Sequence, residues 1–347
     1  EELNINAEES LKKTESDSGH VSDSGHMSES DEVLEYAKNE KSGEIEPYTT
    51  EIVWGNVVKF IILHSLAIYS LTYLPVLSLK MWIFTFLTIQ FSGAGITMGA
   101  HRLWAHKTYK AKLPLRIILT IANSMAGENS IYIWSRDHRT HHKCSEKMGD
   151  PHNAKRGFFF SHMGWLMVRK HPEVIRAGKT VNMSDLENDP LVMLQHKYYI
   201  SSFLFCGFIL PTVLPYFLWG ECLYTAYFMA VFRYVSVLHI TWLVNSAAHF
   251  FGNKPYDKTI GPTENMIVSI LAMGEGFHNY HHTFPYDYST SEWGYTFNTT
   301  TKLIDLMSYF GQAYNLRTAS PETIEARSTR TGIPELTALH QKKNKAL

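Results

Sequence analysis

The sequence predicts an all-α integral membrane protein in which four transmembrane helices form two hairpins and carry a helical cap on the cytosolic side. Three observations predict this fold: four long apolar segments, very short links within each pair of them, and basic residues concentrated between the pairs. Each segment approaches the roughly 20 residues that a helix needs to cross the hydrocarbon of a bilayer. We expect the helices at about 56–77, 80–100, 199–219 and 222–245.

The links inside each pair, Ser78-Leu79 and Gly220-Glu221, are too short for anything except antiparallel hairpins. Most basic residues near the membrane lie in the central segment 101–198, so the positive-inside rule places that segment and both termini in the cytosol. We therefore expect the cap at 101–198 and 246–332. A soluble protein is the competing interpretation, but burying four helices that are apolar nearly all round is unusual.

The tails differ from the domain at 49–332. Residues 1–48 are rich in Ser, Glu, Asp and Lys, which predicts disorder and no cleavable signal peptide. This tail contains SDSGH twice, at 16–20 and 22–26. Three interpretations are open: a phosphorylation segment, a cloning remnant, or a solvated stretch without a defined role. Residues 333–347 form a polar C-terminal tail. The formal net charge of -1 gives no indication of nucleic acid binding.

Histidines recur at helical spacing. HRTHH places His138, His141 and His142 at i, i+3 and i+4, and His278, His281 and His282 repeat the pattern. Residues at these spacings share one face of a helix. His101 and His106 are five apart and would diverge by about 140° on an α-helix, so they converge only if the helix end turns. Asn245 and His249 are four apart at the exit of the fourth membrane helix.

All these clusters fall on one side of the membrane, just beyond or between the predicted helices. Nine converging histidines exceed one tetrahedral site and suit two metal ions with room for a small molecule. Imidazole suits several metals, and a metal pair at the membrane surface with neutral nitrogen ligands and without carboxylate or thiolate ligands favours a di-iron centre that uses O2. A single histidine here would more often be a surface or capping residue, but three such clusters on one membrane face are hard to explain that way. The cysteines at 144, 206 and 222 form no CxxC pair and suggest neither a disulfide nor a metal site.

The motifs HRLWAH, DHRTHH and GEGFHNYHHTFPYDY, together with RGFFFSHMGWLMVRKHP and ITWLVNSAAH, resemble the membrane fatty acyl-CoA desaturases. The resemblance is to the animal stearoyl-CoA desaturase type, in an insect-like form, and covers about residues 50–332. It implies four membrane helices with a cytosolic cap around two iron ions. The metal ligands that it implies are His101, His106, His138, His141, His142, His249, His278, His281 and His282, with Asn245 contacting one metal through water.

The resemblance also implies substrate-binding residues. Coenzyme A carries phosphates, which Arg and Lys bind through charge-assisted hydrogen bonds. The residues that match headgroup positions are Asn56, Asn129, Arg136, Asp137, Arg169 and Lys170, and those that match the bend of the acyl chain are Trp134, Thr241 and Trp242.

Two departures from the family pattern concern the acyl tunnel. Glu128 stands where the family often has Gln, so we expect a buried carboxyl that is protonated or paired. Ile89 and Gly93, on one face of the second membrane helix, stand where the vertebrate pattern has a bulkier aromatic residue and Ala. We expect this loss of volume to deepen the tunnel.

By resemblance, the protein is an oxidoreductase that inserts a cis double bond, by default at delta-9, into a saturated fatty acyl-CoA with O2 as co-substrate. It would act in the biosynthesis of unsaturated fatty acids or of pheromones, in the endoplasmic reticulum membrane. The resemblance implies electrons from cytochrome b5 and its NADH-dependent reductase, and no bound flavin or nicotinamide is expected. The alternatives are another regiospecificity such as delta-11, a di-iron lipid hydroxylase or sphingolipid desaturase, and a membrane metal transporter. Regiospecificity, preferred chain length and oligomeric state do not follow from the sequence.

Overall fold

The computed structural model describes residues 50–333. Within this range the regular elements are helices joined by loops and turns, apart from β1 (Lys110–Ala111) and β2 (Ala313–Tyr314), which pair antiparallel with Lys110 opposite Tyr314. The all-α prediction is therefore confirmed. The expected disordered tail 1–48, both SDSGH copies and all of the C-terminal tail beyond residue 333 lie outside the described residues.

Four helical stretches in the described range are long and apolar enough to cross a membrane, as predicted: Trp54–Val76, Leu79–Ala105, Tyr199–Trp219 and Leu223–Phe250. They comprise α3 (Trp54–Ser70), η1 (Leu71–Val76), α4 (Leu79–Ala94), η2 (Gly95–Ala105), α11 (Tyr199–Leu204), η5 (Phe205–Ile209), α12 (Leu210–Trp219), α13 (Leu223–Asn245) and α14 (Ala247–Phe250). The second and fourth stretches extend further than the sequence indicates, to Ala105 and Phe250.

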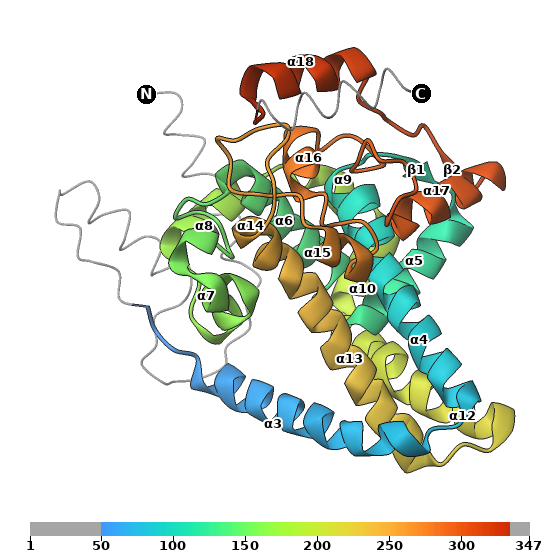
Figure 1. Cartoon of the computed structure of the whole chain (residues 1–347). Helices are drawn as coiled ribbons and strands as arrows, with labels where there is room; N and C mark the ends of the chain where they lie inside the picture. The colour runs from blue at the N-terminus through green and yellow to red at the C-terminus, as the bar shows by residue number, and fades with distance from the viewer. Residues whose placement is uncertain (1–49, 334–347) are drawn as a thin grey trace. The chain divides into compact units, whose positions relative to one another are not determined.

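The two hairpin turns lie together at one end of these helices (Figure 1). Ser78 accepts a hydrogen bond from the Met81 amide and so begins α4, while Gly220 ends α12 with a left-handed φ of 73°. The Ser78 hydroxyl also donates to Glu221 Oε2 at 2.9 Å, which joins one turn to the other. Helix α13 packs against α3, α4 and α12.

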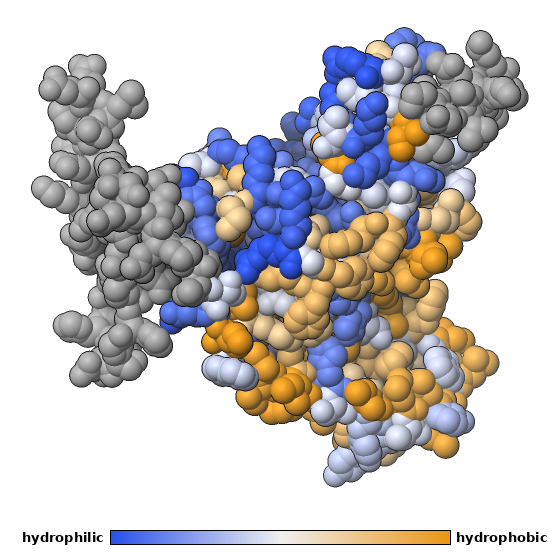
Figure 2. All heavy atoms as spheres, turned by 60° about the vertical axis from the view of Figure 1, so that its left-hand side comes forward, coloured by the Kyte–Doolittle hydropathy of each residue, from blue (hydrophilic) through white to orange (hydrophobic). Residues whose placement is uncertain are grey.

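The surface over these helices is apolar. Ile61 and Ile68 of α3 and Phe217 of α12 are exposed, as is usual for side chains that face lipid. Figure 2 shows this hydrophobic surface in the lower part of the view, with hydrophilic surface above it. The distribution is that of a protein whose lower part lies in a bilayer.

The remaining elements form the cap at the other end of the membrane helices (Figure 1). They are α5 (Leu113–Ala126), α6 (Ile131–Cys144), η3 (Ala154–Arg156), α7 (Phe158–His162), η4 (Gly164–Met167), α8 (Pro172–Lys179), α9 (Ser184–Glu187), α10 (Pro190–Lys197), α15 (Met266–Leu271), α16 (His278–Thr283), α17 (Thr299–Tyr309) and α18 (Pro321–Thr331). Helices α5 and α6 pack directly on η2, around a buried core that includes Leu103, Trp104 and Ile131. This packing holds η2 and α6 side by side.

Candidate metal centre and substrate cavities

A π-helical segment aligns the first pair of histidines. At the end of η2 the His106 amide donates to the His101 carbonyl at 3.0 Å, a bond that spans five residues instead of four. Residues five apart therefore lie on the same face, and the two imidazole centroids are 5.0 Å apart. The sequence predicted that the second membrane helix turns at its end so that His101 and His106 converge. In the structure the π-helical geometry of η2 brings them together instead.

The other histidines come from three further segments. Both HxxHH clusters are helical, as expected: the first lies in α6, and the second forms α16. Asn245 is the last residue of α13, and Ser246 separates it from α14, which carries His249. The regular helix is therefore interrupted at Ser246, so the spacing of a single continuous helix does not relate Asn245 to His249.

All nine predicted histidines converge, in two groups whose ligand atoms lie within 4.8 Å of one another. The first group is His101, His106, His138, His142 and His281, and the second is His141, His249, His278 and His282. Nε2 atoms face each other at 2.8 Å for His106 and His138 and at 3.0 Å for His101 and His281. Nitrogens bound at right angles to one metal ion at about 2.1 Å would be roughly 3 Å apart.

The donor atoms are in the form that binds a metal. Burial lowers the pKa of His106, His138 and His142 well below the usual value, and neighbouring histidines lower it further. Neutral imidazole keeps the lone pair that a metal requires. The buried Nε2 of His249 has no hydrogen-bond partner among the described residues. The residues therefore fit two metal ions with nitrogen ligands.

Three carboxylates, which the sequence analysis did not identify, orient these histidines. Glu275 lies 3.0 Å from Nδ1 of His101, Asp150 lies 2.9 Å from Nδ1 of His141, and Glu146 lies 3.3 Å from Nδ1 of His249. A carboxylate at this distance favours the tautomer with the proton on Nδ1, which leaves Nε2 free to bind a metal. Their closeness to the histidine motifs, in GEGFH and in SEKMGDP, is the only signal in the sequence that could have identified them.

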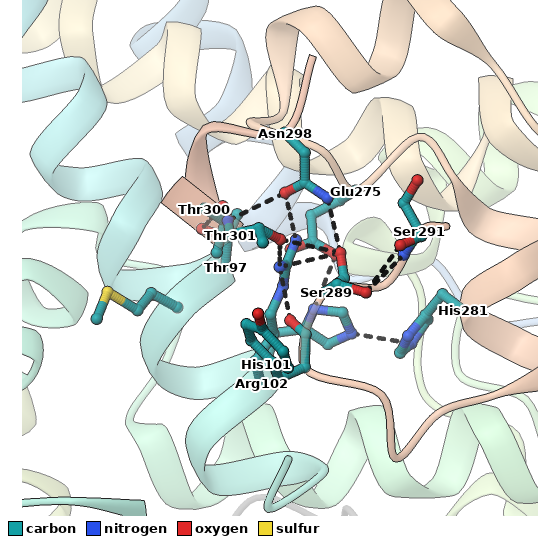
Figure 3. Close-up of polar contacts among 12 residues, drawn as sticks. Thr97, His101, Arg102, Glu275, His281, Ser289, Ser291, Asn298, Thr300 and Thr301 are labelled. Carbon is teal, nitrogen blue, oxygen red and sulfur yellow. Dashed lines mark hydrogen bonds and ion pairs between the residues drawn. The ribbon is translucent and has the colours of Figure 1, made fainter. Parts of the chain in front are cut away.

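Glu275 belongs to a buried polar network (Figure 3). The Arg102 guanidinium, completely buried, lies 2.9 Å from Glu275 Oε1 and also donates to Thr301 Oγ1 at 3.0 Å and to Asn298 Oδ1 at 3.4 Å. Burial by itself would favour the neutral acid, but Arg102 and His101 lower the pKa of Glu275. Arg102 therefore keeps Glu275 ionised as the acceptor for His101.

Two cavities lie beside the histidines and share part of their lining. One is apolar and lies between α4, α13 and the segment after α15, where it is lined by Ile89 and Gly93. The other is larger and is lined by residues that include Glu128, Asn129, Asp137 and Trp242. Both are lined by Trp134, His138, Thr241 and Asn245. A molecule that passes from one cavity to the other therefore passes two predicted metal-binding residues.

A carboxyl group contacts this shared lining. Glu128 accepts a hydrogen bond from the Thr241 hydroxyl at 2.7 Å and from the Trp134 indole at 3.4 Å, and no cation contacts it among the described residues. Burial raises the pKa of Glu128 to about 8, while these two hydrogen bonds lower it slightly. Glu128 is therefore mostly a neutral acid at pH 7. Of the two states expected from the sequence, protonated or paired with a cation, the structure favours the protonated one.

The predicted headgroup residues do not all line the larger cavity. Asn129 and Asp137 line it. Asp137 receives Arg136 at 3.0 Å and Lys170 at 2.7 Å, so these three residues are brought together. Arg169 instead pairs with Glu51 at 2.7 Å. The Asn56 amide donates to the carbonyl of Leu166 at 2.9 Å, and Leu166 lines the larger cavity.

Comparison with known proteins agrees with this geometry. Residues 77–293 match the sequence model of the fatty acid desaturase family. The chain is 53% identical over 304 residues to the acyl-CoA desaturase of Cyprinus carpio, which covers 87% of this chain and 92% of that protein. It is also 53% identical to two proteins of Homo sapiens: stearoyl-CoA desaturase 5, over 81% of this chain and 86% of that protein, and stearoyl-CoA desaturase, over 81% and 79%.

Proposed function

The chain belongs to the fatty acid desaturase family and is an acyl-CoA desaturase of the delta-9 type, and on this premise we propose that its histidines bind two iron ions. The observation that carries the proposal is the convergence of nine histidines, in two groups, beside two cavities that share part of their lining. Imidazole also binds zinc, copper and nickel. Zinc is not redox-active, and the removal of hydrogen from an unactivated methylene requires a redox metal with O2.

The protein's own residues position the substrate for this reaction. The iron, when bound, supplies the oxidising chemistry with O2 that removes two hydrogens from adjacent methylenes, while two electrons and two protons are consumed and two waters form. The acyl chain would enter past Asn129 and Asp137, bend at the lining that the two cavities share and continue between α4 and α13. Trp134 stacks on His138 with ring centroids 4.8 Å apart, which supports a bend at a fixed place relative to a ligand.

The headgroup would bind at the larger cavity. Arg136 and Lys170, held by Asp137, offer cationic donors for the phosphates of coenzyme A. The apolar walls of the other cavity, such as Ile96, Val237 and Ile240, would hold the methyl end of the chain and exclude water. Arg169 and Asn56, which do not line the larger cavity, would act indirectly.

The electrons would come from cytochrome b5 and its NADH-dependent reductase, with the protein in the endoplasmic reticulum membrane and both termini in the cytosol. Two features support this orientation. The hairpin turns lie together at the end of the membrane helices opposite the histidines, and the basic residues concentrate in the cap segment. If an acidic donor docks on this cap, its electron transfer should slow as ionic strength rises.

Expression in a desaturase-deficient yeast tests the whole proposal. We expect new monounsaturated lipids with a delta-9 double bond, located by mass spectrometry after derivatisation, and two irons per purified chain. Replacing His141 and His281 by alanine removes one ligand from each group and should abolish both iron and product. Hydroxylated lipids, a different bond position or an iron-free active enzyme would each contradict the corresponding part of the proposal.

A further inference from the structure

Gly93 on α4 and Met273 in the cap touch at the wall of the apolar cavity, which both residues line. A Cβ atom added at Gly93 would lie 2.9 Å from Met273 Sδ, closer than side-chain atoms approach each other in proteins. The thioether therefore occupies the room that a larger residue at 93 would take. The expectation that a small residue at this position deepens the tunnel is thus incomplete, because Met273 fills the space.

The backbone of Met273 is fixed by its neighbours. Its carbonyl accepts a hydrogen bond from the Thr300 amide at 3.0 Å, and Thr300 Oγ1 in turn donates to Thr97 on η2 at 2.8 Å (Figure 3). Met273 also has a left-handed φ of 57° and is buried. The Cα atom therefore has little freedom, while the unbranched thioether side chain can take several shapes.

Gly93 lies where the end of an acyl chain would be. It is eight residues before the proposed ligand His101, a separation on the order of 10 Å along a helix. Ile89 lies one turn further on the same face and lines the same cavity. The Met273 side chain is thus positioned well beyond the reacting carbons, against the methyl-terminal arm.

We propose that Met273 is a specificity-determining residue whose side chain, seated against Gly93, sets the length of the methyl-terminal arm that the cavity accepts. This inference rests on the proposed function, because it takes the apolar cavity as the site of the methyl end. A longer arm requires the thioether to move, and a methyl group at position 93 pushes the thioether into the cavity.

The test measures kcat/KM of the iron-loaded full-length enzyme with palmitoyl-, stearoyl- and arachidoyl-CoA. Met273→Ala should raise the ratio of long to short substrates by roughly tenfold, the discrimination that one or two methylenes provide. Gly93→Ala should lower the ratio. In the double variant the new methyl has no sulfur to displace, so the two effects should be strongly non-additive. Met273→Val should give a smaller shift in the same direction as Met273→Ala.

Met98→Ala is the matched control, because Met98 is equally buried near the membrane boundary but lines neither cavity. It should leave the chain-length ratio unchanged even if the protein is less stable. Unchanged ratios in both Met273 variants, or additive effects in the double variant, would overturn the inference while the desaturase assignment stands. A parent enzyme that makes no unsaturated product would overturn the proposed function, and the inference with it.

Discussion

Glu275 Oε2 lies 3.0 Å from His101 Nδ1, and the other oxygen of the same carboxylate is held by Arg102. One carboxylate thus joins a buried cation to His101, which belongs to the group of five histidines described above. The arrangement sets the tautomer of His101 and directs Nε2 toward the other histidines. Its effect should be measurable in metal binding.

Glu275→Gln should weaken iron binding by roughly 10- to 100-fold, the usual effect of removing a carboxylate behind a metal-binding histidine. It should also lower stability, because it leaves the completely buried Arg102 without its counter-charge, a loss of about 3–5 kcal/mol. Iron retained after dialysis against graded chelator and the melting temperature measure the two effects. Glu322→Gln, on α18, is the control and should change neither. Iron content equal to that of the parent protein would contradict the role of Glu275.

Activity should fall as pH rises through about 8, because Glu128 then ionises beside the acyl chain. Glu128 accepts both of its hydrogen bonds, from the Thr241 hydroxyl and the Trp134 indole, so the carboxylate would keep them. Ionisation instead places a negative charge beside the apolar acyl chain, and a glutamine never acquires this charge. Glu128→Gln should therefore remain active and lose this limb of the profile of kcat/KM against pH. A limb that persists in Glu128→Gln would assign it to another group.

The same carboxyl should affect stability in a defined pH range. Its pKa is raised from 4.5 to about 8 by burial, so the folded protein keeps a proton that the unfolded chain has released. The contribution of Glu128 to the free energy of unfolding therefore falls as pH rises from about 4.5 to 8. Above about pH 8 the group is ionised in both states, and its contribution stays constant. The stability advantage of Glu128→Gln should grow over this interval, as measured by melting temperature in detergent. A constant difference would mean that Glu128 is ionised throughout.

Lys170→Met should raise KM for acyl-CoA by roughly tenfold, from the loss of one charge-assisted hydrogen bond, with kcat nearly unchanged. The headgroup is remote from the reacting methylenes, so it binds equally well in the ground state and the transition state. Steady-state kinetics with stearoyl-CoA test this. Lys302→Met, on α17 and outside both cavities, is the control. A fall in kcat with KM unchanged would place Lys170 in a different role.

Gly95→Ala should destabilise the protein by about 1–3 kcal/mol or more, because the new methyl would lie 2.3 Å from the backbone of Ala122. The main chain of α5 cannot yield as a flexible side chain does, so η2 and α5 would separate. Gly55→Ala is the matched control, since no atom of the described residues lies within 4 Å of its added Cβ. Equal melting temperatures for the two variants would show that the contact of η2 with α5 is not tight.

The sequence by itself determined the features that depend on local periodicity. Four apolar stretches of sufficient length predicted the membrane helices, and the i, i+3, i+4 spacing placed three imidazoles on one face of α6 and of α16. Both follow from the geometry of a single helix, so they need no knowledge of the rest of the chain.

Tertiary structure decided the features that join distant parts of the chain. The π-helical widening of η2, held against α5 and α6, brings His106 to the face of His101, which an α-helix would not do. Glu275 reaches His101, and Met273 reaches Gly93, only because the cap folds back onto the second membrane helix. The physical reason is that such contacts depend on packing between elements far apart in sequence, which no local pattern records.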